Sequence, residues 1–444
     1  MQKKTTLTRR EFLGKTSIGL AAAGAIPRSF AVSGSPNTLA VQGGTPVRTA
    51  AFPTWPQTTE AVEQNILKSL RNHRWCTTDG EFIPKFEKAW AGKVGSRGCV
   101  MTPCGTHALQ MALELLGVGP GDEVILSPYT YIATADAVMM GYSLPVFADS
   151  DPKTFQIDPD DIEHRITEHT RAIMPVHIFG APSNLDKVLA IGEKHNIPVI
   201  EDACQAHHAE WKGKKVGTLG RIGCFSFQET KCLPGGEAGA LVSDDDELIE
   251  KAFMFRNFGS DPKSHQYATR GFKYRISDFA AAVLMGQLER YEELCAKREG
   301  HAAYLIAELK RIPGYRVQEN YPQSTRQNHY CFGVRCDQDH FKGLPQHKVA
   351  SALAAEGVMA GAGYSPLNKQ PFIEQSLNSR GFRAVYSQER LDKCLRENSH
   401  LPKNDQLCAT AFYLQQNVLL GEKSDVDDVL EAFDKVQKNA SVLS

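Results

Sequence analysis

The sequence predicts an α/β fold in which helices cover a mostly parallel central sheet, followed by a smaller C-terminal α+β domain. Strand-like and helix-like segments alternate between Glu123 and Glu201, and the strand-like segments are apolar on both faces. Beyond Pro313-Gly314, short strands mix with helical stretches in a pattern that no longer alternates regularly. The chain has 444 residues, which is long enough for more than one domain.

The helical segments that flank this alternating region set the expected domain limits. Residues 57–72 and 83–94 carry helical spacing, and a long helix is expected from Ser277 past Gly300. Before them, Gly and Pro residues predict an extended arm. We therefore expect an arm over residues 32–56, a large α/β domain over 57–300 and a small domain over 301–444.

Composition excludes several classes of function. The formal net charge of −1, from 50 basic and 51 acidic residues, gives no reason to expect nucleic acid or an anionic membrane as a partner. The eleven cysteines include no Cys-x-x-Cys pair, so we expect neither a metal site nor a disulfide framework, although one bridge stays open. A Gly-x-Gly-x-x-Gly run and a Gly-Lys-Ser/Thr phosphate loop are also absent, which argues against dinucleotide and nucleoside triphosphate binding.

The N-terminus resembles an export signal. Thr8-Arg9-Arg10-Glu11-Phe12-Leu13-Gly14-Lys15 precedes a short apolar run, and small residues near Ala31 follow it. This is the form of a twin-arginine signal over residues 1–31, and it predicts export, to the periplasm. The alternative is a basic tail, which the apolar run makes the weaker interpretation.

Lys231 lies on a predicted turn between a short strand around Phe225 and the run Pro234-Gly235-Gly236. A lysine in such a place is most often a solvated charge. A second feature changes this interpretation, because Asp202 ends a buried-looking strand about thirty residues earlier. Ligands of parallel sheets collect at the carboxyl ends of strands. The candidates that follow predicted strands, and that one crevice could hold, are Gly105, Tyr131, Asp202 and Lys231.

Four segments together resemble the DegT-type (DegT/DnrJ/StrS) sugar and cyclitol aminotransferases. They are Gly105-Thr106-His107-Ala108-Leu109, the run from Ser127 to Thr134, the run from Glu201 to His207, and the run from Phe225 to Lys231. The resemblance extends from about Gly43 nearly to the C-terminus, and Tyr364-Ser365-Pro366-Leu367 is closest to the inosose-aminotransferase branch. It implies fold type I, the cofactor pyridoxal 5'-phosphate and a homodimer whose subunits complete each other's sites.

The resemblance also implies roles at the reacting end of the cofactor. Lys231 would form the Schiff base with pyridoxal phosphate, because a lysine amine makes imines with carbonyls, and would then carry the proton. Asp202 would face the pyridine nitrogen and keep it protonated. Gln205 would donate a hydrogen bond to the phenolic oxygen, and Tyr131 would stack on the ring.

The phosphate would be held by the Gly105 and Thr106 amides with the Ser226 hydroxyl, since helix N-termini favour anions. Two positions depart from the family pattern. Lys273 stands where an asparagine usually reaches the phosphate of the partner subunit; it either donates as a point charge or the contact is lost. His208 stands where glycine is usual.

The expected reaction is transfer of an amino group from glutamate or glutamine to a keto-sugar or keto-cyclitol, through the Lys231 Schiff base and pyridoxamine phosphate. An alternative is an exported, non-catalytic protein that binds the cofactor or a carbohydrate on the same fold. A carbohydrate oxidoreductase is weaker, because it would need a dinucleotide site. A dehydrating branch of the family has histidine in place of the lysine, and the presence of Lys231 argues against it.

Overall fold

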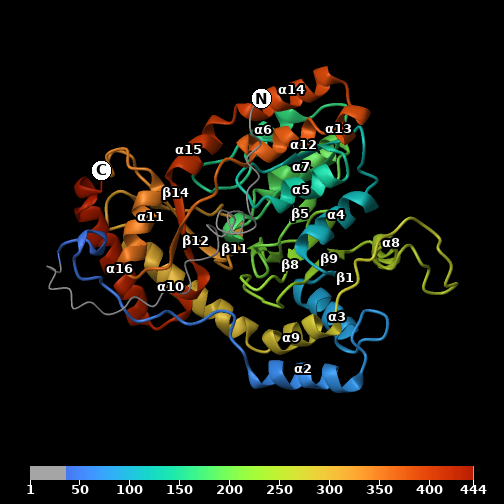
Figure 1. The fold of residues 1–444 in the computed structure, drawn as a ribbon, viewed down its shortest axis with the longest axis horizontal. Helices are drawn as coiled ribbons and strands as arrows, with labels where there is room; N and C mark the ends of the chain where they lie inside the picture. The colour runs from blue at the N-terminus through green and yellow to red at the C-terminus, as the bar shows by residue number, and fades with distance from the viewer. Residues whose placement is uncertain (1–36, 444) are drawn as a thin grey trace, which may run out of the picture.

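The structure is a computed structural model that describes residues 37–443 as two bodies joined by a long helix (Figure 1). The export signal expected at residues 1–31 lies outside the described residues. The larger body holds helices on both sides of a sheet. Its helices are α2 (Glu60–Asn72), α3 (Phe82–Val94), α4 (Gly105–Leu115), α5 (Ala133–Met140), α6 (Pro159–Arg165), α7 (Leu185–His195), α8 (Asp246–Arg256) and α9 (Asp278–Leu288).

The central sheet runs in the order β1-β9-β8-β5-β4-β2-β3. Parallel pairing of Ile173 with Val199 and of Val176 with Asp202 joins its two halves. Of the strands described, β9 alone runs against the others, so the sheet is mostly parallel as the sequence predicts. The strands are β1 (Gly98–Thr102), β2 (Glu123–Leu126), β3 (Leu144–Phe147), β4 (Thr170–Met174), β5 (Ile200–Asp202), β8 (Ile222–Ser226) and β9 (Gly239–Ser243).

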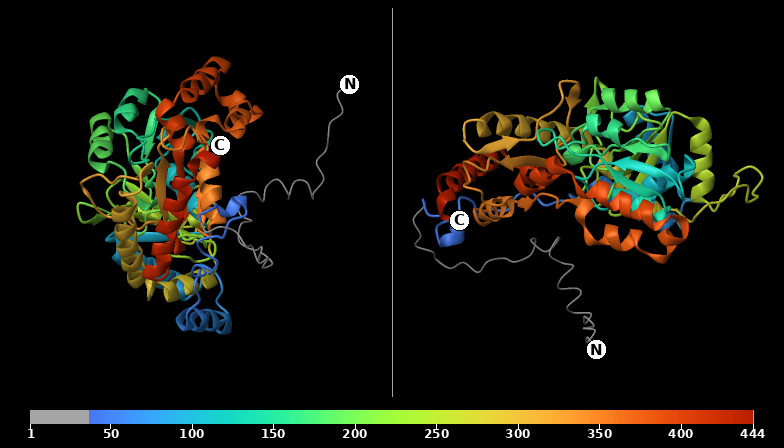
Figure 2. Two further views of the ribbon diagram at one scale, coloured as in Figure 1. Left: turned by 90° about the vertical axis from the view of Figure 1, so that its left-hand side faces the viewer. Right: turned by 90° about the horizontal axis from the view of Figure 1, so that it is seen from above.

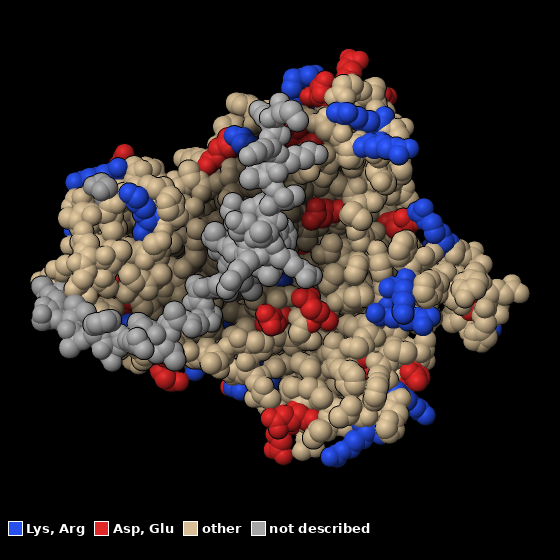
Figure 3. Space-filling view, in the orientation of Figure 1, with Lys and Arg blue, Asp and Glu red and all other residues tan. Residues whose placement is uncertain are grey.

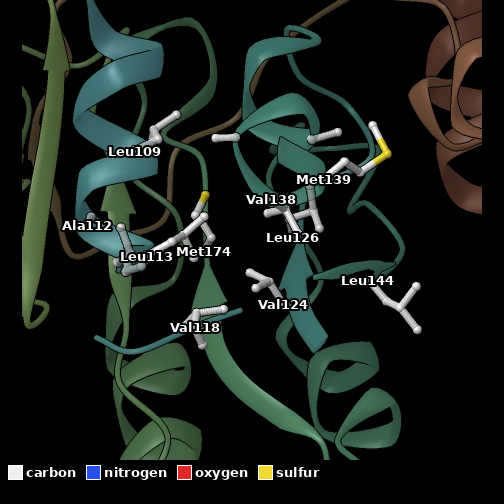
Figure 4. Close-up of a cluster of buried hydrophobic side chains, with 14 of the residues drawn as sticks. Leu109, Ala112, Leu113, Val118, Val124, Leu126, Val138, Met139, Leu144 and Met174 are labelled. Atoms are coloured by element: carbon white, nitrogen blue, oxygen red, sulfur yellow. The ribbon is translucent and has the colours of Figure 1, made fainter. Parts of the chain in front are cut away.

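Both faces of this sheet are buried, because alternate residues of one strand enter different clusters. Ile222 and Cys224 of β8 pack into one apolar cluster with α4 and α5, whereas Phe225 packs on the other face with α3. Figure 4 shows part of the first cluster, where Leu109 of α4, Leu126 of β2 and other side chains point toward one another. This burial explains the continuous apolar runs seen in the sequence.

The long helix expected from Ser277 is two helices, α9 and α10 (Tyr291–Leu309). The break falls at Arg290, whose backbone leaves the helical region with φ −102° and ψ 1°. The change of direction lets α9 pack under the large sheet while Leu305 and Leu309 of α10 enter the core of the smaller body. The apolar periodicity continues across the break, which is why the sequence alone shows one helix.

The smaller body is built on an antiparallel sheet of order β10-β12-β14-β13, packed against helices and against the N-terminal arm. Leu39 and Phe52 of the arm are buried in its core, and Arg48 pairs with Asp425 and Asp428 at 2.7 Å each. Its elements are β10 (Tyr315–Val317), β12 (Cys331–Cys336), α11 (Gln346–Ala355), β13 (Ala360–Ala362), β14 (Ala411–Gln415), η5 (Gln416–Leu420), α16 (Lys423–Lys438) and the short turns η2 (Ala40–Gln42) and η6 (Ala440–Val442).

Between β13 and β14 the chain returns to the larger body. Leu377, Phe382 and Leu391 pack into the same cluster as β2 and α4. In the right-hand view of Figure 2, the orange-red helices of this segment lie against the larger body. The boundary expected at residue 300 stays a prediction, but the chain beyond it contributes to both bodies. The returning elements are η4 (Leu367–Lys369), α12 (Pro371–Leu377), α13 (Arg380–Val385), α14 (Gln388–Ser399) and α15 (Pro402–Thr410).

The remaining elements are short. A small sheet of order β11-β6-β7 joins Ser324–Arg326, Glu210–Trp211 and Lys214–Lys215, and η3 covers Ile178–Gly180. On the face drawn in Figure 3, acidic and basic side chains are interspersed over the surface. Among residues 37–443, no helix combines the length and apolar character that a membrane crossing needs.

Candidate active site

Asp202 ends β5 with its carboxylate buried, at 3% exposure. Its Oδ2 accepts a hydrogen bond from the Thr134 hydroxyl at 2.9 Å, and its Oδ1 accepts one from the Cys204 amide at 3.2 Å. Of the described residues, no Lys, Arg or His side chain lies within ion-pair distance of it. Buried carboxylates are usually paired, so this one is built to meet a cationic group that the chain itself does not supply.

The N-terminus of α4 packs tightly against the ends of two neighbouring strands. A Cβ added at Gly105 would lie 2.7 Å from Cβ of Ser226 and 2.8 Å from Sγ of Cys204. A Cβ added at Gly239 would lie 2.6 Å from the amide nitrogen of Gly105. The start of α4, with the backbone amides of Gly105 and Thr106, therefore packs against Ser226 at the end of β8, and the N-terminus of a helix favours anions.

Lys231 lies on the turn that follows β8, five residues after Ser226. Its Nζ is 4.2 Å from the centre of the Tyr330 ring. Burial lowers the pKa of Lys231, but the Tyr330 phenol and the Cys204 thiol outweigh burial and raise its pKa overall. Burial raises the pKa of Cys204, the Asp202 carboxylate raises it further and Lys231 opposes both. The charges of Asp202 and Lys231 thus both act on this thiol, in keeping with the pairing of β5 and β8, whose ends precede the two groups.

Gln205 is fixed from both ends of its amide. Its Oε1 accepts from the Phe179 amide at 2.9 Å, and its Nε2 donates to the Tyr364 hydroxyl at 3.2 Å. Phe179 has a φ of 57°, an uncommon conformation for a residue with a side chain, and it holds this amide toward Gln205. An amide nitrogen has two hydrogens, so the second one can serve an acceptor in the site.

The side chains of Tyr131 and Lys273 are exposed to solvent. Tyr131 precedes α5 and is 60% exposed, with its carbonyl accepting from the amide of Thr134. Lys273 is exposed in the segment between α8 and α9, which projects from the body of the protein (Figure 1). The base of that segment is docked on α4, because Tyr274 packs against His107 with ring centres 4.2 Å apart and the rings tilted by 31°. The structure therefore links Tyr131 to Asp202 through Thr134 and leaves the Lys273 side chain exposed to solvent.

The two consecutive histidines have different surroundings. His207 donates from Nε2 to the Ser226 carbonyl at 2.6 Å, and burial lowers its pKa to about 3, so the ring is neutral. His208 packs edge-on against Tyr291 of α10, and burial with the nearby Lys215 lowers its pKa to about 3. His208 therefore packs under the start of α10, against a residue of the larger body's core, and His207 supports the backbone at Ser226.

Some residues at the site carry no role in the sequence-based prediction. Thr134, Cys204 and Tyr364 lie within the sequence runs that resemble the aminotransferase family. The short spacing of Thr134 from Tyr131 and of Cys204 from Asp202 could have pointed to two of them. Tyr330 immediately precedes β12 of the smaller body, 99 positions after Lys231, so no local pattern points to it.

An enzyme with a lysine amine, a buried carboxylate and an anion cradle at the carboxyl end of a mostly parallel sheet belongs to the group-transfer class that works through amines and carbonyls. A family model described as the DegT/DnrJ/EryC1/StrS aminotransferase family matches residues 57–411. The chain belongs to this family and is an aminotransferase.

Relatives and solved structures agree with this assignment. The chain is 35% identical over 424 residues to an L-glutamine:2-deoxy-scyllo-inosose aminotransferase of Streptomyces kanamyceticus, covering 91% of this chain and 98% of that protein. A protein of the same name from Micromonospora echinospora is 33% identical, with 90% and 98% covered. The crystal structure of 3-amino-5-hydroxybenzoic acid synthase gives a TM-score of 0.78 at 28% identity, and covers 89% of this chain and 100% of its own.

A second solved structure, an aminotransferase from Psychrobacter cryohalolentis, gives a TM-score of 0.77 at 27% identity. It covers 88% of this chain and 100% of its own. The fold expected from the sequence, a mostly parallel α/β sheet with a smaller C-terminal body, is therefore confirmed as that of aminotransferases.

Proposed function

We propose that this aminotransferase uses pyridoxal 5'-phosphate and moves the amino group of glutamine, or of glutamate, to a keto-cyclitol. The observation that carries the proposal is the buried Asp202 carboxylate, which only neutral donors contact, at the end of a strand that lies beside the strand leading to Lys231 and beside the α4 N-terminus. The donor and the acceptor follow from relatives that are named L-glutamine:2-deoxy-scyllo-inosose aminotransferases and match over nine-tenths of the chain.

The residues present fit this cofactor. The amides of Gly105 and Thr106 with the Ser226 hydroxyl fit its phosphate, because a side chain at position 105 would close the space between α4 and β8. When bound, pyridoxal phosphate supplies an aromatic ring that withdraws electrons from the carbon bearing the amine. Asp202 fits a protonated ring nitrogen, since its two hydrogen-bond donors are neutral and leave its charge uncompensated.

The other residues orient and move protons. Gln205 has a second amide hydrogen that can be donated to the phenolic oxygen of the cofactor. The exposed ring of Tyr131 offers a face on which the flat cofactor ring can stack. Lys231 would attach the cofactor through its Nζ and, once released, its amine would hold the proton that moves to or from the substrate carbon. The Tyr330 ring limits where that Nζ can lie.

The test is the visible absorption of purified protein supplied with pyridoxal phosphate. We expect a band near that of lysine-bound cofactor, which bleaches when glutamine is added, and which Lys231→Ala lacks. Colour without bleaching would support the non-catalytic binder instead. A keto-cyclitol should then restore the band, whereas a nucleotide-linked keto-sugar should restore it more slowly. Restoration by the nucleotide-linked sugar alone would contradict the proposed acceptor.

We also propose a homodimer in which the segment between α8 and α9 reaches the partner subunit. Support comes from its projection away from the body and from the exposed Lys273 within it. Lys273→Ala should weaken cofactor binding without changing folding stability, and analytical ultracentrifugation should give twice the chain mass. A monomeric mass would contradict the dimer.

Export through residues 1–31 remains a proposal, which the paired Arg9-Arg10 supports. Replacing both arginines with lysine should keep the protein in the cytoplasmic fraction when cells are fractionated. Equal release from wild type and variant would contradict it.

A further inference from the structure

The turn that carries Lys231 has two main-chain carbonyls bound from outside the larger body. Within the turn, the Lys231 amide donates to the Gln228 carbonyl at 2.8 Å, and the Gly235 amide donates to the Phe227 carbonyl at 2.7 Å. The carbonyls of Thr230 and Lys231 are bound instead by side chains. These two contacts act on the residues that set where the lysine side chain starts.

The indole Nε1 of Trp55 donates to the Lys231 carbonyl at 3.1 Å, and Nε2 of Gln416 donates to the Thr230 carbonyl at 2.6 Å. Trp55 belongs to the N-terminal arm, and Gln416 begins η5 of the smaller body. Asn417 ties these two segments together by donating from Nδ2 to the Pro53 carbonyl at 2.9 Å. The arm and the smaller body therefore hold the lysine turn as one unit.

Arg298 of α10 fixes the direction of this contact. Its side chain has 0% exposure, and Nη1 donates to Oε1 of Gln416 at 3.2 Å. A guanidinium only donates, so the Gln416 oxygen must face it and the Gln416 amide hydrogens must face Thr230. The guanidinium carbon also lies 6.0 Å from the centre of the Trp55 ring. One buried cation thus orients both side chains of the contact.

We propose that Trp55 and Gln416 are positioning residues for Lys231, and that Arg298 sets their orientation. The inference rests on the proposed function of Lys231, since it explains how that amine is aimed. It adds that the geometry of the amine depends on the docking of the arm and the smaller body, both of which are remote in sequence from the turn. A displacement of about 1 Å at a reacting group can cost roughly 100-fold in rate.

The decisive variant is Gln416→Glu. A glutamate keeps the shape and pairs with Arg298, so it preserves folding, but it has no hydrogen for the Thr230 carbonyl and repels it. Trp55→Phe is the second variant, because it keeps the aromatic ring and removes the indole N–H. Two variants from different segments keep the test informative if one folds poorly.

Matched controls break bonds of the same kind elsewhere. Trp75 donates from Nε1 to the Leu70 carbonyl at 3.2 Å, and Gln287 donates from Nε2 to the Gln57 carbonyl at 2.7 Å. Trp75→Phe and Gln287→Glu therefore match the two test variants in chemistry while leaving the lysine turn alone.

Three readouts separate positioning from folding. The first is the pH titration of the visible absorption of protein loaded with pyridoxal phosphate. The second is the split between kcat and KM. The third is the rate at which an amine-reactive acylating reagent labels Lys231 in cofactor-free protein, followed by peptide mass spectrometry, which does not require activity.

We expect both test variants to lower kcat by roughly 10- to 100-fold with KM nearly unchanged, to shift the spectral titration and to change the Lys231 labelling rate, while both controls behave as wild type. Wild-type values in Gln416→Glu and Trp55→Phe, or equal changes in the controls, would overturn the proposal. If wild-type protein itself showed no visible band, the proposed function would fail, and the labelling comparison would still decide the positioning role.

Discussion

Two neighbouring carboxylates on β5 are buried to nearly the same extent but differ in their hydrogen-bond partners. Glu201 is fully buried, and its oxygens accept from Nε2 of His177 at 2.9 Å and from the amides of Gly217 and Leu219 at 2.7 Å each. Asp202 on the other face of the sheet has only neutral donors, from Thr134 and Cys204. The chain supplies Glu201 with hydrogen-bond donors to both carboxylate oxygens, whereas Asp202 retains room for a further, cationic partner.

The difference shows how a partner set separates a structural acid from a functional one. Burial raises the pKa of Glu201, but His177 and the N–H groups of Gly217 and Gly220 outweigh burial and lower its pKa overall. The chain thus stabilises the Glu201 charge by itself. Asp202 can still pair with a cationic group, so of the two carboxylates it is the stronger candidate for a role in binding and catalysis.

The largest expected effect is that of Asp202→Asn on activity. Removing the charge that faces the ring nitrogen should lower kcat by about 10³-fold or more, on the scale of a lost electrostatic contact in an active site. The free energy of unfolding should stay the same or rise, because an unpaired buried charge is removed. Steady-state kinetics and urea unfolding check both parts, and wild-type activity in this variant would remove Asp202 from the site.

Glu201→Gln should reverse this profile. The amide N–H₂ of glutamine would face N–H donors, so we expect a loss of about 1–3 kcal/mol in the free energy of unfolding, as when buried donors lose their acceptor. The kcat of the folded protein should stay close to wild type. Urea unfolding at constant pH measures the loss, and a stable but inactive variant would contradict the structural role.

Acid should destabilise the protein through groups that cannot take up a proton when folded. Burial lowers the pKa of His207 and of His329 to about 3 from 6.5. Between these values the unfolded chain binds protons that the folded chain does not, so stability falls as the pH drops below 6.5, by about 1.4 kcal/mol per pH unit for each histidine. The stabilising effect of Glu201, whose pKa is lowered, is present above 4.5 and is lost as the pH falls through its folded pKa.

Urea midpoints measured from pH 7 down to pH 4.5 test this slope. His329→Gln should flatten it, whereas His347→Gln, at an exposed position, should leave it unchanged. An unchanged slope in the His329 variant would mean that this ring does not stay neutral in the folded state.

The smallest expected effect is that of Thr134→Val. It removes the hydroxyl that donates to Asp202, a hydrogen bond to a charged group, and should lower kcat about 10-fold. Thr134→Ser keeps the donor and should retain most of the activity. Equal losses in both variants would place the effect in packing instead of in the hydrogen bond.

Local sequence patterns predicted much of the large sheet and the strand-end position of Asp202. The alternation of apolar segments predicted parallel strands, and the position of Asp202 at a strand end predicted the edge where it lies, because both follow from short stretches of chain. The helices between Pro371 and Thr410 were missed, although Pro371 and Pro402 at first helical positions were signals for two of them. The single long helix expected after Ser277 was wrong, since its apolar pattern runs across the break.

By itself, the sequence determined the chemistry that is available: a lysine on a turn, an aspartate at a strand end and a glycine that opens a helix. Periodicity and turn residues encode such features locally. Only the tertiary structure decided that donors from the chain stabilise the charge of Glu201 while Asp202 keeps room for a further partner. It also decided that Trp55 and Gln416 hold the Lys231 turn from 176 and 186 positions away. Contacts at these separations depend on how the two bodies dock, and a single sequence carries no local pattern for that docking.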